Sequence, residues 1–307
     1  MIRYVLKRII WLIPVIIAVS FIVFTLMELA PGNFIDAIMS EEMTPEERQE
    51  LIERHNLHRP MIYRYGLYML NLVQGDLGVS DHTQISVWGT FINRLPNTLI
   101  LSFSALIIGV AISIPLGMIA ARRAGSLADN AVTLFALIGM SMPLFWLGLM
   151  LLLVFSLYLR WLPSGAFDDG IRSLVLPALC SSLSLMANSA RQTRSNMLEV
   201  LKADYLRTAL AKGVPEETVI RKHALGNAWI PIITSIGGSL SRTMAGSAIV
   251  ETVFSIPGLG RFMIDGINRR DYPVIQSTML IFAFTFIIVN TLVDLLYGLA
   301  DPRIKYD

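Results

Sequence analysis

Long apolar runs constrain the fold of this chain more than any other feature of its sequence. Six stretches approach or exceed the roughly 20 apolar residues that an α-helix needs to cross a bilayer. Only 16% of the residues are charged, against about a quarter in a soluble domain. The expected fold is therefore all-α, a polytopic membrane protein with six transmembrane helices. These helices are expected at about 9–29, 97–121, 132–159, 174–190, 228–254 and 274–299.

The six runs are not equally apolar. The third contains Pro143, which should kink the helix or mark its boundary. The fourth is short and carries serine and asparagine, and the fifth carries Arg242 and Glu251. The first run follows three basic residues, so a cleaved signal peptide is the competing interpretation. Its length of about 21 apolar residues favours an uncleaved span.

The distribution of Lys and Arg predicts the orientation, because short basic loops are retained in the cytoplasm. Basic groups fall before the first span, after the second, between Arg191 and Lys222, and after the sixth. With six spans these groups share one side of the membrane, so both chain termini are expected in the cytoplasm. Arg261, Arg269 and Arg270 lie on the opposite side, against the rule.

The spans divide the chain into three regions. Residues 1–29 form the N-terminal segment and first span, 30–96 an external insertion, and 97–307 the core domain. Within the insertion, Thr44-Pro45-Glu46-Glu47 is a capping box with proline at the first helical position, which predicts a helix to about His55. The single cysteine, Cys180, cannot form an internal disulfide.

A polar, basic segment at 203–225 separates the fourth and fifth spans. Leu198, Leu201, Tyr205 and Ala209 are spaced three and four apart, which predicts one apolar stripe on a helix that continues out of the fourth span. Gly213 should end that helix. Pro215 should begin a second short helix that ends near Lys222 and His223, with Glu216 and Glu217 in its first turn. The residues alone leave two alternatives open, an amphipathic helix on anionic lipid or a docking surface for a soluble partner.

The stretch "ADYLRTALAKG" at 203–213 resembles the cytoplasmic EAA loop of ABC-importer permeases. Ala209 and Gly213 keep the spacing of that motif. Arg207 stands where many members have an acid, and Gly226 where many have proline. Both departures resemble the peptide and nickel branch of the family.

Further stretches resemble the same branch along the whole chain. Asn33 in "APGN" replaces an acid of the branch pattern. The order of the motifs, with six spans between them, is similar to the first of two permease subunits in dipeptide, oligopeptide or nickel importers, the DppB/OppB type. The motifs are "APGN" at 30–33, "GDLG" at 75–78, "RLPNTL" at 94–99, "ETVFSIPGLG" at 251–260, "RRDYPV" at 269–274 and "DPR" at 301–303.

The resemblance implies a type I importer permease in the bacterial cytoplasmic (inner) membrane, with partners and no enzymatic activity of its own. The implied partners are a homologous second permease, two P-loop ATPases that bind ATP and Mg, and an extracytoplasmic substrate-binding protein. The chain itself has no G-x-x-x-x-G-K-[ST] phosphate loop. The loop at about 191–227, here called the coupling loop, would dock on an ATPase. Its coupling residues would be Tyr205, Arg207, Thr208, Ala209, Lys212, Gly213, Pro215, Glu216, Glu217 and Arg221.

Polar residues inside two spans are candidates for the translocation pathway, because polar groups in a membrane are expensive. The alternative for the serines is close helix packing. Arg242 either lines the pathway or pairs with Glu251 or Asp294. The predicted pathway residues are Ser181, Ser184, Asn188, Ser235, Ser239 and Arg242.

Four charged residues at the outer end of the fifth span are expected at the external gate or the binding-protein contact. These are Glu251, Asp265, Arg270 and Asp271. No metal site is expected, since His55 and His58 lack the i, i+4 spacing on a helix and a nearby cysteine.

The most favoured function is therefore the permease of an ATP-driven importer of di- or oligopeptides. The same machinery could carry nickel, a metallophore, glutathione or another small solute. A more distant alternative is an ion-coupled secondary transporter that uses Asp294, Glu251 and Arg242, although neither extra spans nor inverted repeats are evident.

Overall fold

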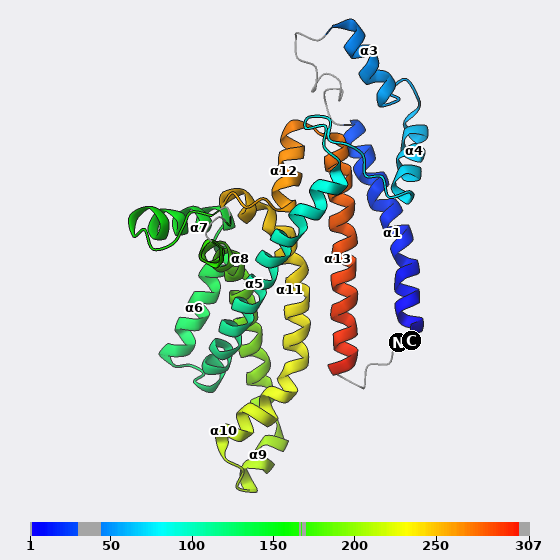
Figure 1. Cartoon of the computed structure of the whole chain (residues 1–307). Coiled ribbons are helices and arrows are strands. Elements are labelled where there is room, and N and C mark those ends of the chain that lie inside the picture. Colours follow the sequence, from blue (N-terminus) through cyan, green and yellow to red (C-terminus); the bar gives the residue numbers. More distant parts are fainter. Residues whose placement is uncertain (1, 30–43, 166, 168–169, 301–307) are drawn as a thin grey trace. The chain divides into compact units, whose positions relative to one another are not determined.

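The computed structural model describes residues 2–29, 44–165, 167 and 170–300. Over these ranges the chain is helical, apart from loops and one isolated β-bridge between Val79 and Ser86 (Figure 1). The all-α expectation is confirmed. The helices are α1 Ile2–Leu29, α3 Pro45–Arg54, α4 Met61–Val73, α5 Val87–Arg122, α6 Leu127–Ser141, α7 Leu144–Leu151, η1 Leu152–Tyr158, α8 Ile171–Leu201, α9 Asp204–Ala211, α10 Glu216–Thr218, η2 Val219–Ala224, α11 Leu225–Val253, α12 Leu259–Arg269 and α13 Tyr272–Ala300.

Each of the six segments that were expected to cross the membrane is helical, five of them within one helix and the segment 132–159 within α6, α7 and η1. Within the described residues, three helices are long and apolar enough to do so, namely α5, α8 and the 272–291 part of α13. In the most apolar 18-residue stretch of each helix, 67% is buried in α8 but only 28% in α5. α8 is thus an interior helix, and it contacts α6, α7, α11 and η2. The total of six transmembrane helices stays a prediction.

The third predicted span is broken at Pro143. α6 and the α7–η1 helix meet at an angle of 106°, with Pro143 as the N-cap of α7. The proline cannot continue the hydrogen bonding of α6, and it holds the preceding residue in an extended conformation. The sequence-based expectation of a kink or boundary at this position is confirmed.

The chain folds as two compact units. The first unit comprises Met1–Asn97 and Pro257–Ile288, and the second comprises Thr98–Ile256 and Val289–Asp307. α5 and α13 therefore each contribute residues to both units.

In the first unit, α4 packs against α1, and the loop after α4 is tied to the start of α13. The Ser20 hydroxyl lies 2.8 Å from the Tyr65 phenol oxygen across the α1–α4 contact. The Ser277 hydroxyl donates to the Leu77 carbonyl at 2.8 Å. Gly78 has φ +81°, and a Cβ there would lie 3.4 Å from Pro273. The described part of the external insertion predicted at 30–96 thus contains α3, α4, a loop held by hydrogen bonds and the start of α5, which begins at Val87 rather than after 96.

In the second unit, a buried cluster joins α5, α8 and the end of α11. It contains Leu101, Leu176 and Phe254, and partly buried side chains of the 159–170 loop pack against it. Gly165 in that loop has φ +133°, and a Cβ there would lie 2.0 Å from the Phe254 carbonyl oxygen. Only glycine fits this approach of two backbones.

Candidate functional site

The coupling loop has two breaks that define its shape. α8 ends at Leu201, and the chain resumes as α9 after Lys202 and Ala203. α9 ends at Ala211, and Gly213 adopts the left-handed conformation with φ +80°, as its position in the sequence predicted. The helix therefore does not continue out of α8 into this segment, which corrects the sequence-based expectation.

The second helix of the loop also differs from its prediction. α10 begins after Pro215, as expected, but it does not end near Lys222 and His223. The π-helical turn η2 carries the chain without interruption into α11. The helix therefore passes through a wider π-helical turn at the position where a helix end was expected.

The inner face of the coupling loop packs on the second unit. Leu206, Val219 and Ile220 form a buried cluster with Ile114 of α5 and Met197 of α8. Tyr205, by contrast, is 44% exposed. Leu198, Leu201 and Ala209 of the predicted apolar stripe do pack against this cluster. Tyr205 does not, because the chain breaks after Leu201 and α9 turns Leu206 inward in its place.

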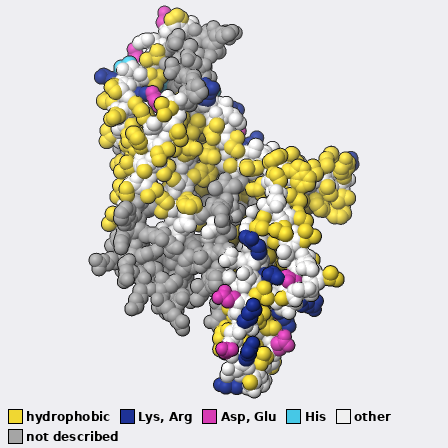
Figure 2. Space-filling model, turned by 180° about the vertical axis from the view of Figure 1, so that it is seen from behind, with side chains coloured by type: hydrophobic (Ala, Val, Ile, Leu, Met, Phe, Trp, Pro, Cys, Tyr) yellow, Lys and Arg dark blue, Asp and Glu magenta, His cyan; other side chains and the backbone are white. Residues whose placement is uncertain are grey.

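The outer face of the loop is polar and exposed. We call residues 204–218, which cover α9, the turn at Gly213 and α10, the docking surface. Figure 2 shows charged side chains gathered at this end of the second unit, beyond an apolar surface. Ala209 is partly buried against the inner cluster, and the Arg221 side chain lies outside the described residues. The exposed members of the predicted set are Tyr205, Arg207, Thr208, Lys212, Gly213, Pro215, Glu216 and Glu217.

Two ion pairs connect the docking surface and the preceding helix α8 to the turn between α5 and α6. Glu217 of α10 accepts a hydrogen bond from Arg122 at the end of α5, at 3.1 Å. Arg194 of α8 binds both carboxylate oxygens of Asp129 in the first turn of α6, with 2.7 Å from Nη2 to Oδ2. The α5–α6 turn is therefore held both by Glu217 within the docking surface and by Arg194 of α8, the helix that precedes it.

Local sequence explains why Asp129 is positioned for this contact. Ser126 is the N-cap of α6 and accepts from the Asp129 amide. The Asp129 carboxylate accepts from the Gly125 amide at 2.9 Å and is nearly buried. The S-x-x-D capping pattern at 126–129 was visible in the sequence, but its partner Arg194 was not, because 65 residues separate the two.

The predicted pathway residues of α8 do not share one environment. Ser181 is buried, and Ser184 is exposed. The Asn188 amide donates to the Ser184 carbonyl at 3.0 Å, within the same helix. The side chains of Ser235, Ser239 and Arg242 lie outside the described residues, as does that of Asp294. Their assignment to a pathway stays a prediction.

The four residues predicted at the outer end of α11 also separate into two kinds. Glu251 is fully buried and accepts a hydrogen bond from Thr98 at 2.8 Å. Asp271 is 3% exposed and accepts from the Ser80 hydroxyl and the Val274 amide. Asp265 and Arg270 are accessible, and Asp265 lies 4.0 Å from Arg261. Among the residues that the structure describes, no group of His, Cys, Asp and Glu is arranged to hold a metal ion.

Two family models match nearly the whole chain. Residues 113–306 match the binding-protein-dependent transport system inner membrane component, and residues 1–102 match the N-terminal region of the same kind of protein. The first of these matches includes the coupling loop, and the second includes α1, α3 and α4.

Relatives of this chain match it from end to end. The di/tripeptide transport system permease protein DppB of Pseudomonas aeruginosa is 40% identical and aligns over 100% of this chain and 99% of its own. The oligopeptide transport system permease protein AppB of Bacillus subtilis is 38% identical over 100% of both chains. The dipeptide transport system permease protein DppB of Escherichia coli is 37% identical over 100% and 99%.

Solved structures share the fold at low identity. A chain of the inward-facing MetNI methionine ABC transporter matches 70% of this chain and 97% of its own, with a TM-score of 0.57 and 16% identity. A chain of an amino acid ABC transporter with histidines matches 70% and 94%, with a TM-score of 0.51 and 18% identity. The relatives are permeases rather than enzymes, and this chain is a transport component of the same kind. The chain belongs to the inner-membrane permease components of binding-protein-dependent ABC importers, in the dipeptide and oligopeptide branch.

Proposed function

We propose that this chain forms half of the membrane pathway of an ATP-driven importer of di- or oligopeptides. The observation that carries the proposal is the full-length identity of about 40% to a permease of di/tripeptide transport. The docking surface is exposed and includes most of the stretch that resembles the EAA loop, which supports the proposal from the structure. Nickel, a metallophore, glutathione or another small solute is the alternative cargo of the same machinery.

The docking surface is proposed to bind a separate P-loop ATPase. Its outer face presents charged side chains, whereas its inner face is fixed by the buried cluster around Leu206. A rigid, polar protrusion of this kind suits a partner that is soluble and changes shape. Because the cluster includes Ile114 of α5 and Met197 of α8, a push on the docking surface would be passed to both helices.

The turn between α5 and α6 is proposed to carry the same motion into α6. Glu217 reaches Arg122 from one side, and Arg194 holds Asp129 from the other. The pair at Glu217 is exposed, so it contributes little to stability. The bidentate pair at Asp129 is the stronger link, because Asp129 is 4% exposed in its side chain.

The remaining partners and the orientation follow from the family and from the loop charges. A second permease would complete the pathway, and an extracytoplasmic binding protein would deliver the substrate. The coupling loop and both termini would lie in the cytoplasm, as the positive-inside rule predicts. Asp265 and Arg270, which are accessible, are the better candidates for contact with the binding protein than the buried Asp271.

Uptake in cells tests the proposal. A strain that lacks its own peptide importers receives this chain together with the transport genes that neighbour it, and the uptake of a labelled dipeptide is measured. The expected result is uptake that requires ATP and survives collapse of the proton gradient. Uptake that disappears with the gradient would favour the ion-coupled transporter. In that case the single substitution Asp294→Asn should also abolish uptake. Uptake of nickel but not of dipeptide would select the alternative cargo.

A further inference from the structure

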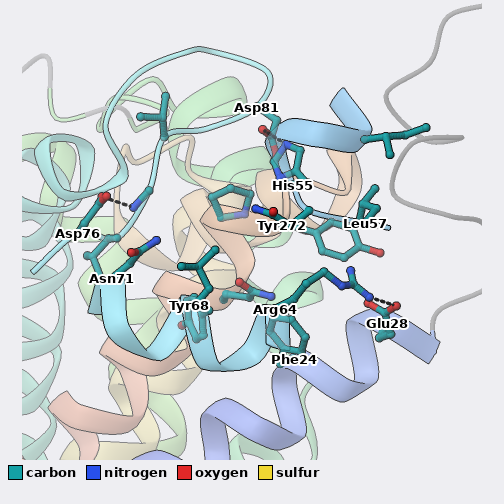
Figure 3. A pocket seen from close by; sticks show the side chains of 18 of the residues that line it. Phe24, Glu28, His55, Leu57, Arg64, Tyr68, Asn71, Asp76, Asp81 and Tyr272 are labelled. Atoms are coloured by element: carbon teal, nitrogen blue, oxygen red, sulfur yellow. Dashed lines mark hydrogen bonds and ion pairs between the residues drawn. The ribbon is translucent and has the colours of Figure 1, made fainter. Parts of the chain in front are cut away.

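The first unit contains a cavity of about 770 Å³ that none of the transport roles above uses. Its walls come from the end of α1, the end of α3, α4, the loop after α4 and the start of α13 (Figure 3). The volume falls within the range of small-molecule sites, which is about 300–1,000 Å³. The cavity can therefore hold a small solute rather than a few water molecules.

The ionisable groups of the lining carry an excess of negative charge. Among the described lining residues, carboxylates come from Glu28, Asp76 and Asp81, whereas the single guanidinium is that of Arg64. Arg64 is paired with Glu28, and the His55 imidazole lies 3.1 Å from Asp81 (Figure 3). Pairing leaves these carboxylates with acceptor capacity, because each can accept at two oxygens. The charge of the cavity favours a cation.

Three buried polar atoms around the cavity lack a hydrogen-bond partner within the described part of the chain. They are Oδ2 of Asp81, Nε of Arg64 and the phenol oxygen of Tyr68. The Asp81 side chain is only 5% exposed. Burial also raises the pKa of Tyr68 well above its usual value, so its phenol stays protonated, and the phenol oxygen can still accept a hydrogen bond from a cationic donor. Buried polar groups are almost always paired in folded proteins, so these atoms indicate a missing polar occupant.

The rest of the lining combines apolar and aromatic side chains with polar ones such as Asn71 and Gln276. Phe24 of α1, Leu67 of α4 and Tyr272 of α13 are among its apolar and aromatic members. Aromatic faces attract cations, and aliphatic side chains bind an apolar body. The lining thus combines a carboxylate oxygen that needs a donor with apolar and aromatic side chains that can contact an apolar body.

We propose that this cavity binds a solute that carries a primary ammonium group on an apolar body, with the ammonium at Asp81. The ammonium supplies the donors that Asp81 Oδ2 lacks, and the body packs between Phe24 and Tyr272. The site goes beyond the proposed function, because a permease can import a peptide without binding it here. A free peptide N-terminus and a simple alkylamine share the chemistry that the site recognises.

Calorimetric titration of the assembled transporter, purified in nanodiscs without its binding protein, tests the site. The probes are isoamylamine, isoamyl alcohol, the dipeptide Leu-Leu and its N-acetyl form. Isoamylamine should bind and isoamyl alcohol should not, since the two differ only in the charged group. Leu-Leu binding that competes with isoamylamine and is lost on N-acetylation identifies a peptide as a ligand. Binding of isoamylamine that Leu-Leu does not displace identifies small amines, rather than peptides, as the ligands.

Two variants and a matched control locate the binding. Asp81→Asn keeps the size of the side chain and removes its charge, and it should weaken isoamylamine binding about tenfold or more. Tyr68→Phe removes one oxygen and should weaken it several-fold. Glu50→Gln removes an exposed carboxylate of α3, in the same unit but outside the cavity lining, and should leave binding unchanged.

Three results would each overturn the proposal. They are no binding of isoamylamine, equal binding of isoamyl alcohol, and unchanged affinity in a correctly assembled Asp81→Asn transporter. If Asp81→Asn fails to assemble, the comparison of amine and alcohol on the unmodified protein still decides the matter. Dipeptide uptake with the binding protein present is measured separately, so loss of this site with uptake retained would leave the proposed function standing.

Discussion

Arg194 of α8 donates hydrogen bonds to both carboxylate oxygens of Asp129, although the two residues are 65 positions apart in the chain. Asp129 is almost buried, whereas 30% of the Arg194 side chain is exposed. The pair fastens the first turn of α6 to the helix that leads into the coupling loop. Small residues bring the same elements together, since Ala120, Val132 and Ala190 form a buried cluster beside the pair.

Breaking this pair should uncouple transport. Asp129→Asn leaves the guanidinium without its anionic partner and should lower the free energy of unfolding by about 2 kcal/mol. The loss is smaller than for a fully buried pair because Arg194 remains partly solvated. Peptide uptake should fall several-fold more than the amount of assembled transporter. Thermal unfolding in detergent and uptake in vesicles measure the two effects.

A charge swap provides the control for that prediction. Asp129→Arg combined with Arg194→Asp should recover part of the uptake, whereas either single change should not. Arg122→Gln, which removes the exposed pair with Glu217, should change stability by less than about 0.5 kcal/mol. Equal loss of uptake in Arg122→Gln and Asp129→Asn would contradict the ranking of the two links.

Gly213→Trp should abolish uptake without unfolding the membrane helices. Gly213 has φ +80°, and no other atom lies within 4 Å of its would-be Cβ, so the indole would project from the docking surface. The left-handed conformation itself adds about 1 kcal/mol of strain for a residue other than glycine. Copurification of the ATPase with the tagged permease should be lost.

Gly75→Trp is the matched control for Gly213→Trp. Gly75 has φ +81° and equally open surroundings, but it lies in the first unit. The two variants therefore share the backbone strain and the added bulk. ATPase recovery that falls equally in both would show that strain, rather than the docking surface, causes the loss.

Gly165→Ala should destabilise the second unit strongly. The added Cβ would lie 2.0 Å from the Phe254 carbonyl oxygen, and neither backbone can move without opening the buried cluster around Phe254. We expect a loss of about 2–3 kcal/mol, seen as a lower Tm. Gly226→Ala, in α11 with open surroundings, should instead be neutral or stabilise by up to about 1 kcal/mol. A similar Tm for both variants would be inconsistent with the close approach at Gly165.

Asp271→Ala should destabilise the first unit, because several donors would lose their acceptor. The Asp271 carboxylate accepts from the Ser80 hydroxyl and from the Asp81 and Val274 amides. Removing it should cost about 2–3 kcal/mol in unfolding experiments. Asp265→Ala should cost less than about 0.5 kcal/mol, since its pair with Arg261 is exposed. A large effect on binding-protein affinity with unchanged stability in Asp271→Ala would restore the contact role first expected for it.

Much of the architecture follows from short-range sequence patterns. Runs of about 20 apolar residues predict where helices lie, because each backbone group in a bilayer must be satisfied within its own segment. Pro143 and Gly213 predicted their breaks correctly, since proline and glycine act on local backbone geometry. The family could also be recognised from the motif order, and its assignment rests on residues whose spacing is visible in the chain.

The failures share a different cause. The break after Leu201 turned Leu206 rather than Tyr205 to the interior, and no proline or glycine at the break announces it. Asp271 was expected at the external gate or the binding-protein contact, and the structure buries its carboxylate against Ser80, 191 positions away in the chain. Its role at a gate stays a prediction.

The sequence by itself determined the membrane class, the helical segments, the positions of the main breaks and the family. Only the tertiary structure decided which charged residues form buried ion pairs and which are accessible, as the pairing of Arg194 with Asp129 shows. It also decided that a cavity lies beside Asp81. The physical reason is that helix formation depends on neighbours within one or two turns. Burial and ion pairing depend on which distant segments the packing brings together.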